Sequence, residues 1–591
     1  MRSDTLLSLS PRAGHAGPAR FTTALLAAVL LVAPPLLGAQ VGTAAQRDAA
    51  RLLKQGSFGP TVPEIDRVAV IGPRLWIEQQ MAAPATLHLE GLDAHYRALL
   101  PLHNLGRTQP ETACIQSSLC RHARRDVWWR TAVTAPDQLR QRVAFALSQF
   151  FVVSDVNSDV AYTQYAPADF YDTLVVHAFG DFRTLLEEVT LHPAMGRYLG
   201  MLQNEKANPA LNSSPDENYA REVMQLFTIG LNELNPDGSL RLDRDGAPIA
   251  TYGDAEISAF ARVFTGWNYA NATRWRFHRV AAGVMGHIDP MRPNEAFHDT
   301  GAKTLLRGTR LPAGLRARED LRRALDNLVA HPNVGPFFAR FMIQRLVTSN
   351  PSPAYVARVA AAFDDNGLGR RGDLGAVVRA VLLDPEARDP AIATAPHYGK
   401  LKEPLLRYTA LWRAFDARGV TAANAAGSVT GIFRFHNSDA LLGQAPLSAP
   451  SVFNFFRPNY RKPGAIRELG LFSPEFQIVN DNTAIHMVNR LHASVFNSDR
   501  DMVGVSRTLG STLSQSGNIA LDFSAEKRLA AQPAALRDLL DLLLMAGTMP
   551  PAMKQVLVDA AARMPMADGG RQRVEDTVFL IVSSPQFSVQ R

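Results

Sequence analysis

Two carboxylates and an arginine lie close together in residues 213–230, SSPDENYAREVMQLFTIG. Glu217 and Glu222 are candidates for a general acid or base, and Arg221 between them is a candidate for stabilising negative charge. Asn218 adds a hydrogen-bonding group to the same face of the expected helix. Because Glu217 and Arg221 are four residues apart, an ordinary surface ion pair explains the same spacing.

A second set of reactive side chains lies in the loop FHDTGAK, residues 297–303. His298 is a candidate proton carrier, Asp299 could orient it, and Lys303 could stabilise an anion. Side chains that are neighbours in a loop need not meet, so a hydrogen-bonded structural turn is the alternative. His298, Asp299 and a carboxylate of residues 213–230 would be the ligands of a divalent metal, but no ligand spacing in the sequence predicts a metal site.

Aromatic residues outside these two stretches could line a groove for a carbohydrate or a peptide. Trp267 is the candidate binding residue among them, although packing in a helical core is the favoured explanation for most of these residues. The other members of this set are Trp275, Phe277, Phe453, Phe455, Phe456 and Tyr460.

Several common classes of site are disfavoured by the sequence. It has no glycine-rich nucleotide-binding loop and no Gly-x-Ser-x-Gly turn. Asp243 and Asp245 fit the first positions of a calcium loop, but Pro248 stands where glycine is required and Asp254 where glutamate is required. An EF-hand is therefore excluded, and no cofactor is indicated.

The element that must position Glu217 and Glu222 is a helix. Ser214 and Glu217 have the spacing of a capping box, with Pro215 at the first helical position and Gly230 as the residue that ends the helix. The sequence thus predicts a helix over residues 215–229.

Most of the remaining chain also has helical periodicity. Apolar residues at i, i+4, i+7 and i+8 begin a helix after Pro136. Further helices are predicted at 169–178, 182–191, 256–264, 320–330, 334–347, 353–363, 373–383, 402–415, 474–491, 533–545, 551–562 and 574–582. Alternation around Asp245-Gly246 predicts a β-hairpin over 239–252, and residues 270–315 are expected to form a long ordered loop or a small β excursion. The predicted fold class is mainly α: a large multi-helical globular fold of helical hairpins with a small β-hairpin insertion.

The amino terminus has the pattern of a secretory signal peptide. Arg12 and Arg20 precede an apolar run over residues 21–37, and small residues follow. Pro34 and Pro35 leave this run shorter than the roughly 20 residues of a membrane span, which argues against the alternative of an uncleaved anchor. The mature chain is therefore expected to be periplasmic or secreted.

The two cysteines and the net charge limit the partners. In an oxidising compartment Cys114 and Cys120 are expected to form a disulfide, with two free thiols as the alternative. The net charge of +7 falls to +5 when residues 1–39, with three arginines and one aspartate, are removed. So small a charge on a chain of this size is a weak argument for nucleic acid, and no nucleic-acid partner is expected.

These patterns give four segments. They are a signal peptide (1–39), an irregular, short-helical layer (40–130), a main helical domain with both candidate stretches (131–400), and a C-terminal helical region (401–591) packed on it. At this length, with 46% hydrophobic residues, the chain can bury an ample core.

A series of short motifs, taken together and in order, resembles the bacterial domain-of-unknown-function family 1800. They are DENYARE (216–222), LFTIG (226–230), NPDG (235–238), ARVFTGW (261–267), HDTGAK (298–303), KEP (402–404), PSVFNFF (450–456) and SPQF (584–587). The resemblance implies an exported, mostly helical protein, whose gene often neighbours that of an exported sulfatase-like protein. It implies no activity.

This chain departs from the family pattern at two places. Many members have Asn-Glu-Asn where this sequence has Asp216-Glu-Asn218, and an aromatic helix rich in Asn and His where it has FALSQFF, residues 145–151. If that helix contributes a histidine to a site in the relatives, the site here is altered.

The expected function is hydrolysis or group transfer on an extracellular polymer in a cleft between the two stretches. Glu217 or Glu222 would be the acid or base and His298 the proton carrier, with Arg221 and Lys303 stabilising negative charge. The alternative is a binding or accessory module for another exported protein, such as a sulfatase-like one. In that case the same residues form a buried polar network.

Overall fold

The computed structural model describes residues 42–103, 114, 118–277, 279–424, 427–496, 514–516 and 519–591. The predicted signal peptide, residues 1–39, lies outside this part of the chain. Residues 41–591 form one compact unit. Within it, segments far apart in sequence meet: α1 contacts α24, and strand β5 pairs with β9. The predicted boundaries near residues 130 and 400 stay predictions.

Helices dominate the described residues, and the predicted mainly α fold class is confirmed. The first group is α1 (Ala44–Gly56), α2 (Val62–Ile71), α3 (Pro73–Ala82), α4 (His88–His103), α5 (Ser118–Thr134), α6 (Gln138–Leu147), α7 (Tyr165–Val176), α8 (Phe182–Leu191), α9 (Pro193–Tyr198), α10 (Asn218–Gln225), α11 (Asp254–Val263), α12 (Arg279–Ile288) and α13 (Ala317–Val329). Short 3₁₀ helices are η1 (Pro209–Leu211), η2 (Glu295–Phe297) and η3 (Leu306–Gly308).

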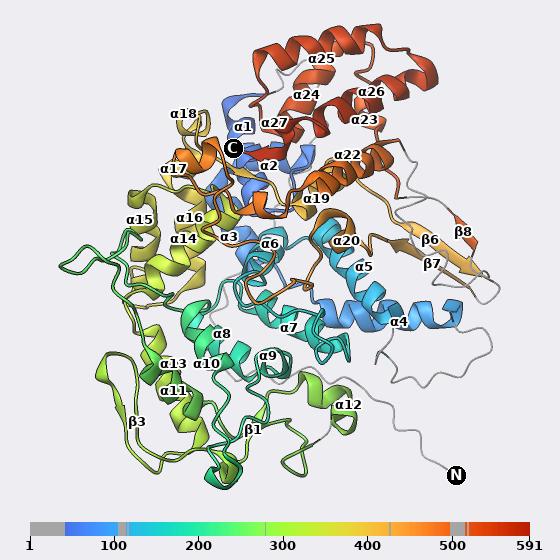
Figure 1. Cartoon of the computed structure of the whole chain (residues 1–591). Coiled ribbons are helices and arrows are strands. Elements are labelled where there is room, and N and C mark those ends of the chain that lie inside the picture. The colour runs from blue at the N-terminus through green and yellow to red at the C-terminus, as the bar shows by residue number, and fades with distance from the viewer. Residues whose placement is uncertain are drawn as a thin grey trace, which may run out of the picture. The chain divides into compact units, whose positions relative to one another are not determined.

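The second group begins with two hairpin partners, α14 and α15, which pack against each other and against α16. Its members are α14 (Val334–Leu346), α15 (Pro353–Asp364), α16 (Leu374–Leu383), α17 (Pro385–Arg388), α18 (Pro390–Ala393), α19 (Pro404–Ala414), α20 (Ser438–Leu442), α21 (Ala465–Glu468), α22 (Asp481–Val495), α23 (Ser524–Lys527), α24 (Pro533–Met545), α25 (Pro551–Arg563), α26 (Ala567–Val582) and α27 (Pro585–Ser588), with the 3₁₀ helix η4 (Pro474–Ile478). In Figure 1 the red helices α24 to α27 lie beside blue α1, so the two ends of the described chain meet.

Strands are few, short and antiparallel. The pairs are β1 (Trp267–Asn268) with β2 (Arg292–Pro293), β3 (Lys303–Thr304) with β4 (Arg310–Leu311), and β5 (Lys400–Leu401) with β9 (Val589–Gln590). One sheet has three strands in the order β7 (Gly427–Ile432), β6 (Val420–Asn424), β8 (Ser514–Ser516). The hairpin predicted at 239–252 consists of single bridges, of which Leu242 with Pro248 closes the turn.

The N-terminal segment is more regular than the sequence predicted. The described residues between 44 and 134 include α1 to α5, each with ten to seventeen residues. Pro63 and Pro73 do not interrupt these helices but lie in the first turns of α2 and α3. Proline fits that position, because its missing amide hydrogen has no partner within a helix in any case.

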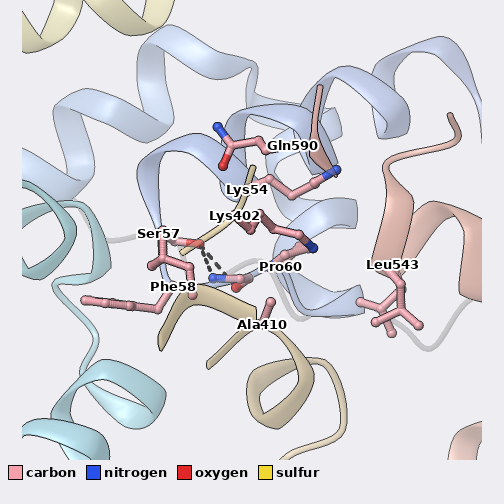
Figure 2. A pocket seen from close by; sticks show the side chains of 11 residues that line it. Lys54, Ser57, Phe58, Pro60, Lys402, Ala410, Leu543 and Gln590 are labelled. Carbon is pink, nitrogen blue, oxygen red and sulfur yellow. Dashed lines mark hydrogen bonds between the residues drawn. The ribbon is translucent and has the colours of Figure 1, made fainter. Parts of the chain in front are cut away.

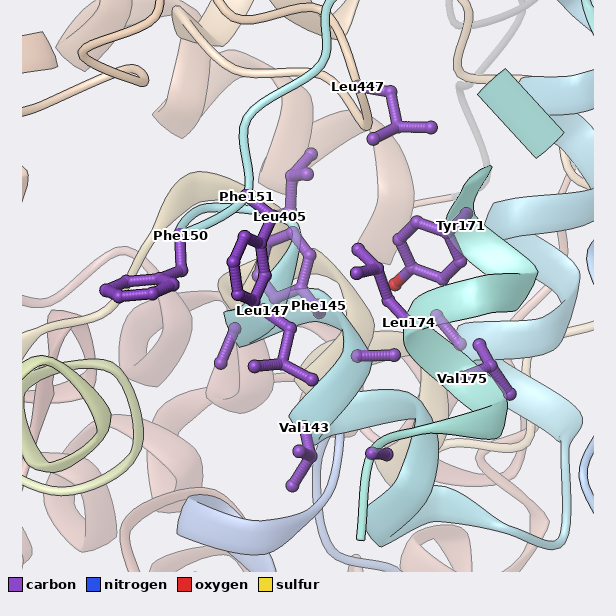
Figure 3. Close-up of a cluster of buried hydrophobic side chains, with 14 of the residues drawn as sticks. Val143, Phe145, Leu147, Phe150, Phe151, Tyr171, Leu174, Val175, Leu405 and Leu447 are labelled. Carbon is purple, nitrogen blue, oxygen red and sulfur yellow. The ribbon is translucent and has the colours of Figure 1, made fainter. Parts of the chain in front are cut away.

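The core is one continuous set of buried apolar side chains. Figure 3 shows part of it: Val143, Phe145 and Leu147 on α6, Phe150 and Phe151 just after it, Leu174 on α7 and Leu405 on α19. The apolar spacing that predicts a helix after Pro136 is therefore the buried face of α6. This packing holds α6, α7 and α19 together.

Cys114 and Cys120 form a disulfide, as predicted, with their Cα atoms 5.3 Å apart. Both residues are fully buried. Across the described ranges, none of the helices combines the length and the apolar content that crossing a membrane requires.

Candidate functional site

Helix α10 begins later than the sequence predicted. The predicted capping box of Ser214 and Glu217 does not form, because residues 214–217 are non-helical and α10 starts at Asn218. The backbone amide of Asn218 donates a hydrogen bond to the side chain of Asp216 at 2.8 Å. The side chain of Asn204 forms hydrogen bonds with both the amide and the carbonyl of Asp216, at 2.8 and 3.0 Å. These bonds fix the segment that leads into the helix.

The outer face of α10 carries the predicted ion pair. Arg221 Nη2 lies 3.4 Å from Glu217 Oε2, and both side chains are more than two-fifths exposed. The other carboxylate oxygen of Glu217 accepts a hydrogen bond from Ser258 on α11 at 2.9 Å. Asn218 is also exposed. An exposed pair of this kind contributes about 0.5 kcal/mol or less to stability.

Glu222 lies on the inner side of α10, apart from that pair. Its side chain is 7% exposed, and Oε2 has no hydrogen-bond partner among the described residues. The hydroxyl of nearby Tyr252 is likewise buried without such a partner. Burial raises the pKa of Glu222 above 4.5, and the charge of Arg221 opposes this only in part. The buried position of Glu222 thus disfavours the charged form of its carboxyl.

Substituting Glu222 by glutamine should therefore change the pH dependence of stability. Above pH 4.5 Glu222 is ionised in the unfolded chain but still protonated in the folded chain. The free energy of unfolding therefore falls as the pH rises from 4.5 to the higher pKa of the folded state. In Glu222→Gln this loss is absent, and the variant should be more stable than wild type at pH 7 but not at pH 4. Urea unfolding at intervals of one pH unit measures this.

Glu217→Gln, a change on the exposed face, is the control for that measurement. A difference between Glu222→Gln and wild type that stays constant from pH 4 to pH 7 would contradict the assignment of a raised pKa.

The second predicted stretch turns inward. His298 is fully buried, with Nδ1 at 3.0 Å from the carbonyl of Thr265 and Nε2 at 3.1 Å from Asp320 on α13. Lys303 donates to the same oxygen of Asp320 at 2.6 Å and to the carbonyls of Asp299 and Gly301. His298, Lys303 and Asp320 therefore form an internal network, which we call the loop network.

Asp299 joins this loop to α11. Its carboxylate accepts two hydrogen bonds from Arg262, both 2.9 Å, and one from the amide of Gly301. Burial raises the pKa of Asp299, but the bonds from Arg262 and Gly301 outweigh it, and the net pKa is below the usual value. Asp299 therefore acts here as the anchor of a tight turn.

The two stretches are linked by α11 without sharing a pocket. One turn apart on that helix, Ser258 bonds to Glu217 and Arg262 bonds to Asp299. Three cavities among the described residues lie elsewhere: near Lys54 and Lys402, between α19, α22 and the end of α26, and between Gly180 and Arg371. The common cleft that the sequence predicts is not among them.

Trp267, the predicted binding aromatic, is fully buried. Its backbone carbonyl accepts a hydrogen bond from the backbone amide of Gln203 at 2.7 Å. In the pairing of β1 with β2, Trp267 lies opposite Pro293. Arg318 lies over the indole ring at 5.9 Å. These contacts are those of a packing residue.

Sequence reasoning missed a dense group of buried charges around Glu403, the residue before α19. Glu403 is fully buried, and its Oε2 accepts from Gln149 at 2.7 Å and from Gln444 at 2.6 Å. Lys400 lies 3.8 Å from the other oxygen and 2.9 Å from Glu475. We call these residues, with Arg142 and Arg345, the charged cluster.

The two arginines complete the charged cluster from α6 and α14. Arg142 donates to the carbonyl of Arg345 at 2.5 Å, and Arg345 lies between the rings of Phe341 and Phe456 at 4.9 and 4.5 Å. In each guanidinium, Nε and Nη1 have no hydrogen-bond partner among the described residues. Burial lowers the pKa of Arg142 to about 10, against the charge of Glu403. The cluster thus depends on charge pairing in a region of low dielectric constant.

A third buried group joins α4, α5 and the residues after β7. Asp126 binds Nε2 of His95 at 3.2 Å and Nε2 of His436 at 2.6 Å. His122 stacks on His436 with ring centres 4.1 Å apart, and burial lowers its pKa to about 3. Although burial opposes it, the charges and hydrogen bonds of the two histidines lower the pKa of Asp126. This group holds three distant segments together.

One signal in the sequence could have led to the charged cluster. Arg142 and Arg345 lie next to apolar residues in α6 and α14, and a charge on the buried face of a helix needs a partner from elsewhere in the chain. Gln149 belongs to the stretch where this chain departs from the family pattern, and it contacts Glu403 directly.

No group of three or more His, Cys, Asp or Glu side chains has an arrangement that could hold a metal ion, as far as the described ranges extend. His298 and Asp299 point to different partners, Asp320 and Arg262. The candidate ligand set of His298, Asp299 and a carboxylate of α10 is thus not assembled in the described structure.

The fold and these sites define a large, mainly α protein with several buried polar networks. The chain belongs to the family described as "Protein of unknown function (DUF1800)", whose model matches residues 51–589. No curated protein and no solved structure matches it. The resemblance deduced from the short motifs is confirmed.

Proposed function

We propose that the protein is an exported binding or accessory module, and that its partner is another exported protein. The observation that best supports this is the internal pairing of the predicted catalytic groups: His298 and Lys303 bond to Asp320 in the core. An enzyme needs its acid, base and anion-stabilising groups around one space that holds the substrate. Groups that already satisfy each other inside the fold are suited to holding helices in register.

Export is part of this proposal. Its support is the signal-peptide pattern of residues 1–39 together with the buried disulfide of Cys114 and Cys120, because structural disulfides persist mainly in oxidising compartments. The partner is taken from the family resemblance and is an exported sulfatase-like protein of the same source.

Complex formation tests the proposal directly. The chain is purified from the periplasm or the medium, its first residue is read by mass spectrometry, and it is mixed with the sulfatase-like protein. We expect a first residue near position 40 and a complex with a Kd of about 1 µM or tighter, measured by size-exclusion chromatography with light scattering. Two separate species at concentrations well above that Kd would contradict the binding role.

Glu222 supports a second candidate, a hydrolase or transferase, because it is a buried carboxyl with a raised pKa and a free oxygen. Wild type, Glu222→Gln and the surface control Glu217→Gln are therefore compared on polysaccharides and peptides. Turnover that Glu222→Gln abolishes, with Glu217→Gln unchanged, would favour the enzyme over the module.

A further inference from the structure

Two lysines line one small cavity near the place where the two ends of the described chain meet. Lys54 comes from the last turn of α1 and Lys402 from the residue pair before α19. The other walls are Ser57 to Pro60, Leu406, Ala410, Leu543, Leu544 and Gln590. We call this cavity the lysine pocket. Figure 2 shows both ammonium groups extending to the side of the pocket where Leu543 lies.

Both lysines are buried without a counter-charge in contact. Lys54 is 9% exposed and Lys402 is 4% exposed. No described residue accepts a hydrogen bond from either ammonium group or forms an ion pair with it. Lys402 Nζ lies 3.4 Å from the centre of the Phe587 ring. An aromatic face attracts a cation but does not neutralise it.

Neighbouring positive charges further disfavour the charged form of both lysines. Burial is the main cause that lowers the pKa of both lysines, to about 8 for Lys54. Arg51 and Arg591 lower the pKa of Lys54 further, and Lys54 and Arg407 do so for Lys402. Asp541 raises the pKa of Lys54, but its carboxylate is already paired with Lys554 at 2.7 Å.

A buried cation without a partner is costly, and it either loses its proton or binds an anion. We propose that the lysine pocket binds a small anion of about the size of a carboxylate group between Lys54 and Lys402. The cavity determines this size, since the centre of a water molecule can move within only about 20 Å³ of it. That is room for one or two small groups and not for a sugar or a peptide side chain.

The walls are suited to a small ligand held by charge. Gly59 approaches α19 so closely that a Cβ atom there would lie 2.5 Å from the Cα atom of Ala410. The hydroxyl of Ser57 is engaged with the carbonyls of Leu53 and Gly59. The two ammonium groups are therefore the free donors of this pocket, and an anion between them would hold α1 against the start of α19.

Formate tests the proposal, because it is the smallest carboxylate. Thermal unfolding of the mature full chain is measured at pH 7 and constant ionic strength, with sodium formate replacing sodium gluconate, a carboxylate too large for the pocket. We expect formate to raise the melting temperature saturably with a Kd of about 1 mM, and Lys402→Met to weaken binding about tenfold or more. Lys206→Met, a change at an exposed lysine, should leave the response unchanged.

The outcomes are separable. Because removing a buried charge can itself change stability, Lys54→Met is measured as well, and the quantity compared is the response to formate rather than the melting temperature. Crystals soaked in bromide give a second readout, in which we expect an anomalous peak between the two Nζ atoms. Equal responses to formate in wild type and Lys402→Met, or no bromide in the pocket, would overturn the proposal. Neither result bears on binding of an exported protein partner, which this site does not require.

Discussion

Replacing Glu403 by alanine should lower the free energy of unfolding by about 3–5 kcal/mol, because it removes one partner of a buried charge network. Glu403 is fully buried, and Lys400 and the guanidinium of Arg142 lose a neighbouring negative charge when it is removed. The amides of Gln149 and Gln444 lose their shared acceptor at the same time. Chemical unfolding with a common m-value for wild type and variant measures the loss.

A matched pair of variants shows whether charge or shape is responsible. Glu403→Gln keeps the shape and removes only the charge, so its loss should be intermediate. Glu217→Gln, on the exposed face of α10, should change stability by about 0.5 kcal/mol or less. If Glu403→Ala were as mild as Glu217→Gln, the charged cluster would not be a structural element of the fold.

Replacing Asp320 by alanine is expected to cost about 3 kcal/mol or more, since it leaves the buried ammonium of Lys303 without its carboxylate. His298 loses its acceptor at Nε2 in the same change. Denaturant unfolding of Asp320→Ala, Lys303→Met and the double variant forms a double-mutant cycle. The double variant should be more stable than Asp320→Ala alone, because no unpaired charge then remains in the core.

This cycle also separates the two functions considered for the loop network. A structural network gives a large coupling energy between Asp320 and Lys303. A catalytic role for His298 or Lys303 with little structural contribution would instead give nearly additive, small losses of stability, and that result would contradict the internal role described here.

Local signals in the sequence predicted much of the fold. Helix α8 and helix α24 have the predicted bounds, and α14 and α15 differ from them by a single residue. These helices have a clear apolar period and a proline, an asparagine or an aspartate at their start, which are properties of neighbouring residues. The disulfide is equally local, since Cys114 and Cys120 are six residues apart.

The start of α10 was predicted wrongly because its cap is not local. Ser214, Pro215 and Glu217 satisfy the sequence pattern of a capping box. In the structure, Asn204 fixes the backbone of Asp216 from twelve residues away, and Asp216 then caps the helix. A tertiary contact thus overrides the local preference.

The candidate site shows the same division. Local patterns of residues were enough to indicate the groups that could do chemistry, the helical class of the fold, the cysteine pair and the family. Which charges are buried, and which partners they have, depends on how the helices pack: Glu403 contacts Gln149, 254 residues away, and His298 contacts Asp320 on another helix. Helical periodicity gives the direction of a side chain on its own helix, but the dielectric environment and the partner of that side chain are set by the helices packed against it.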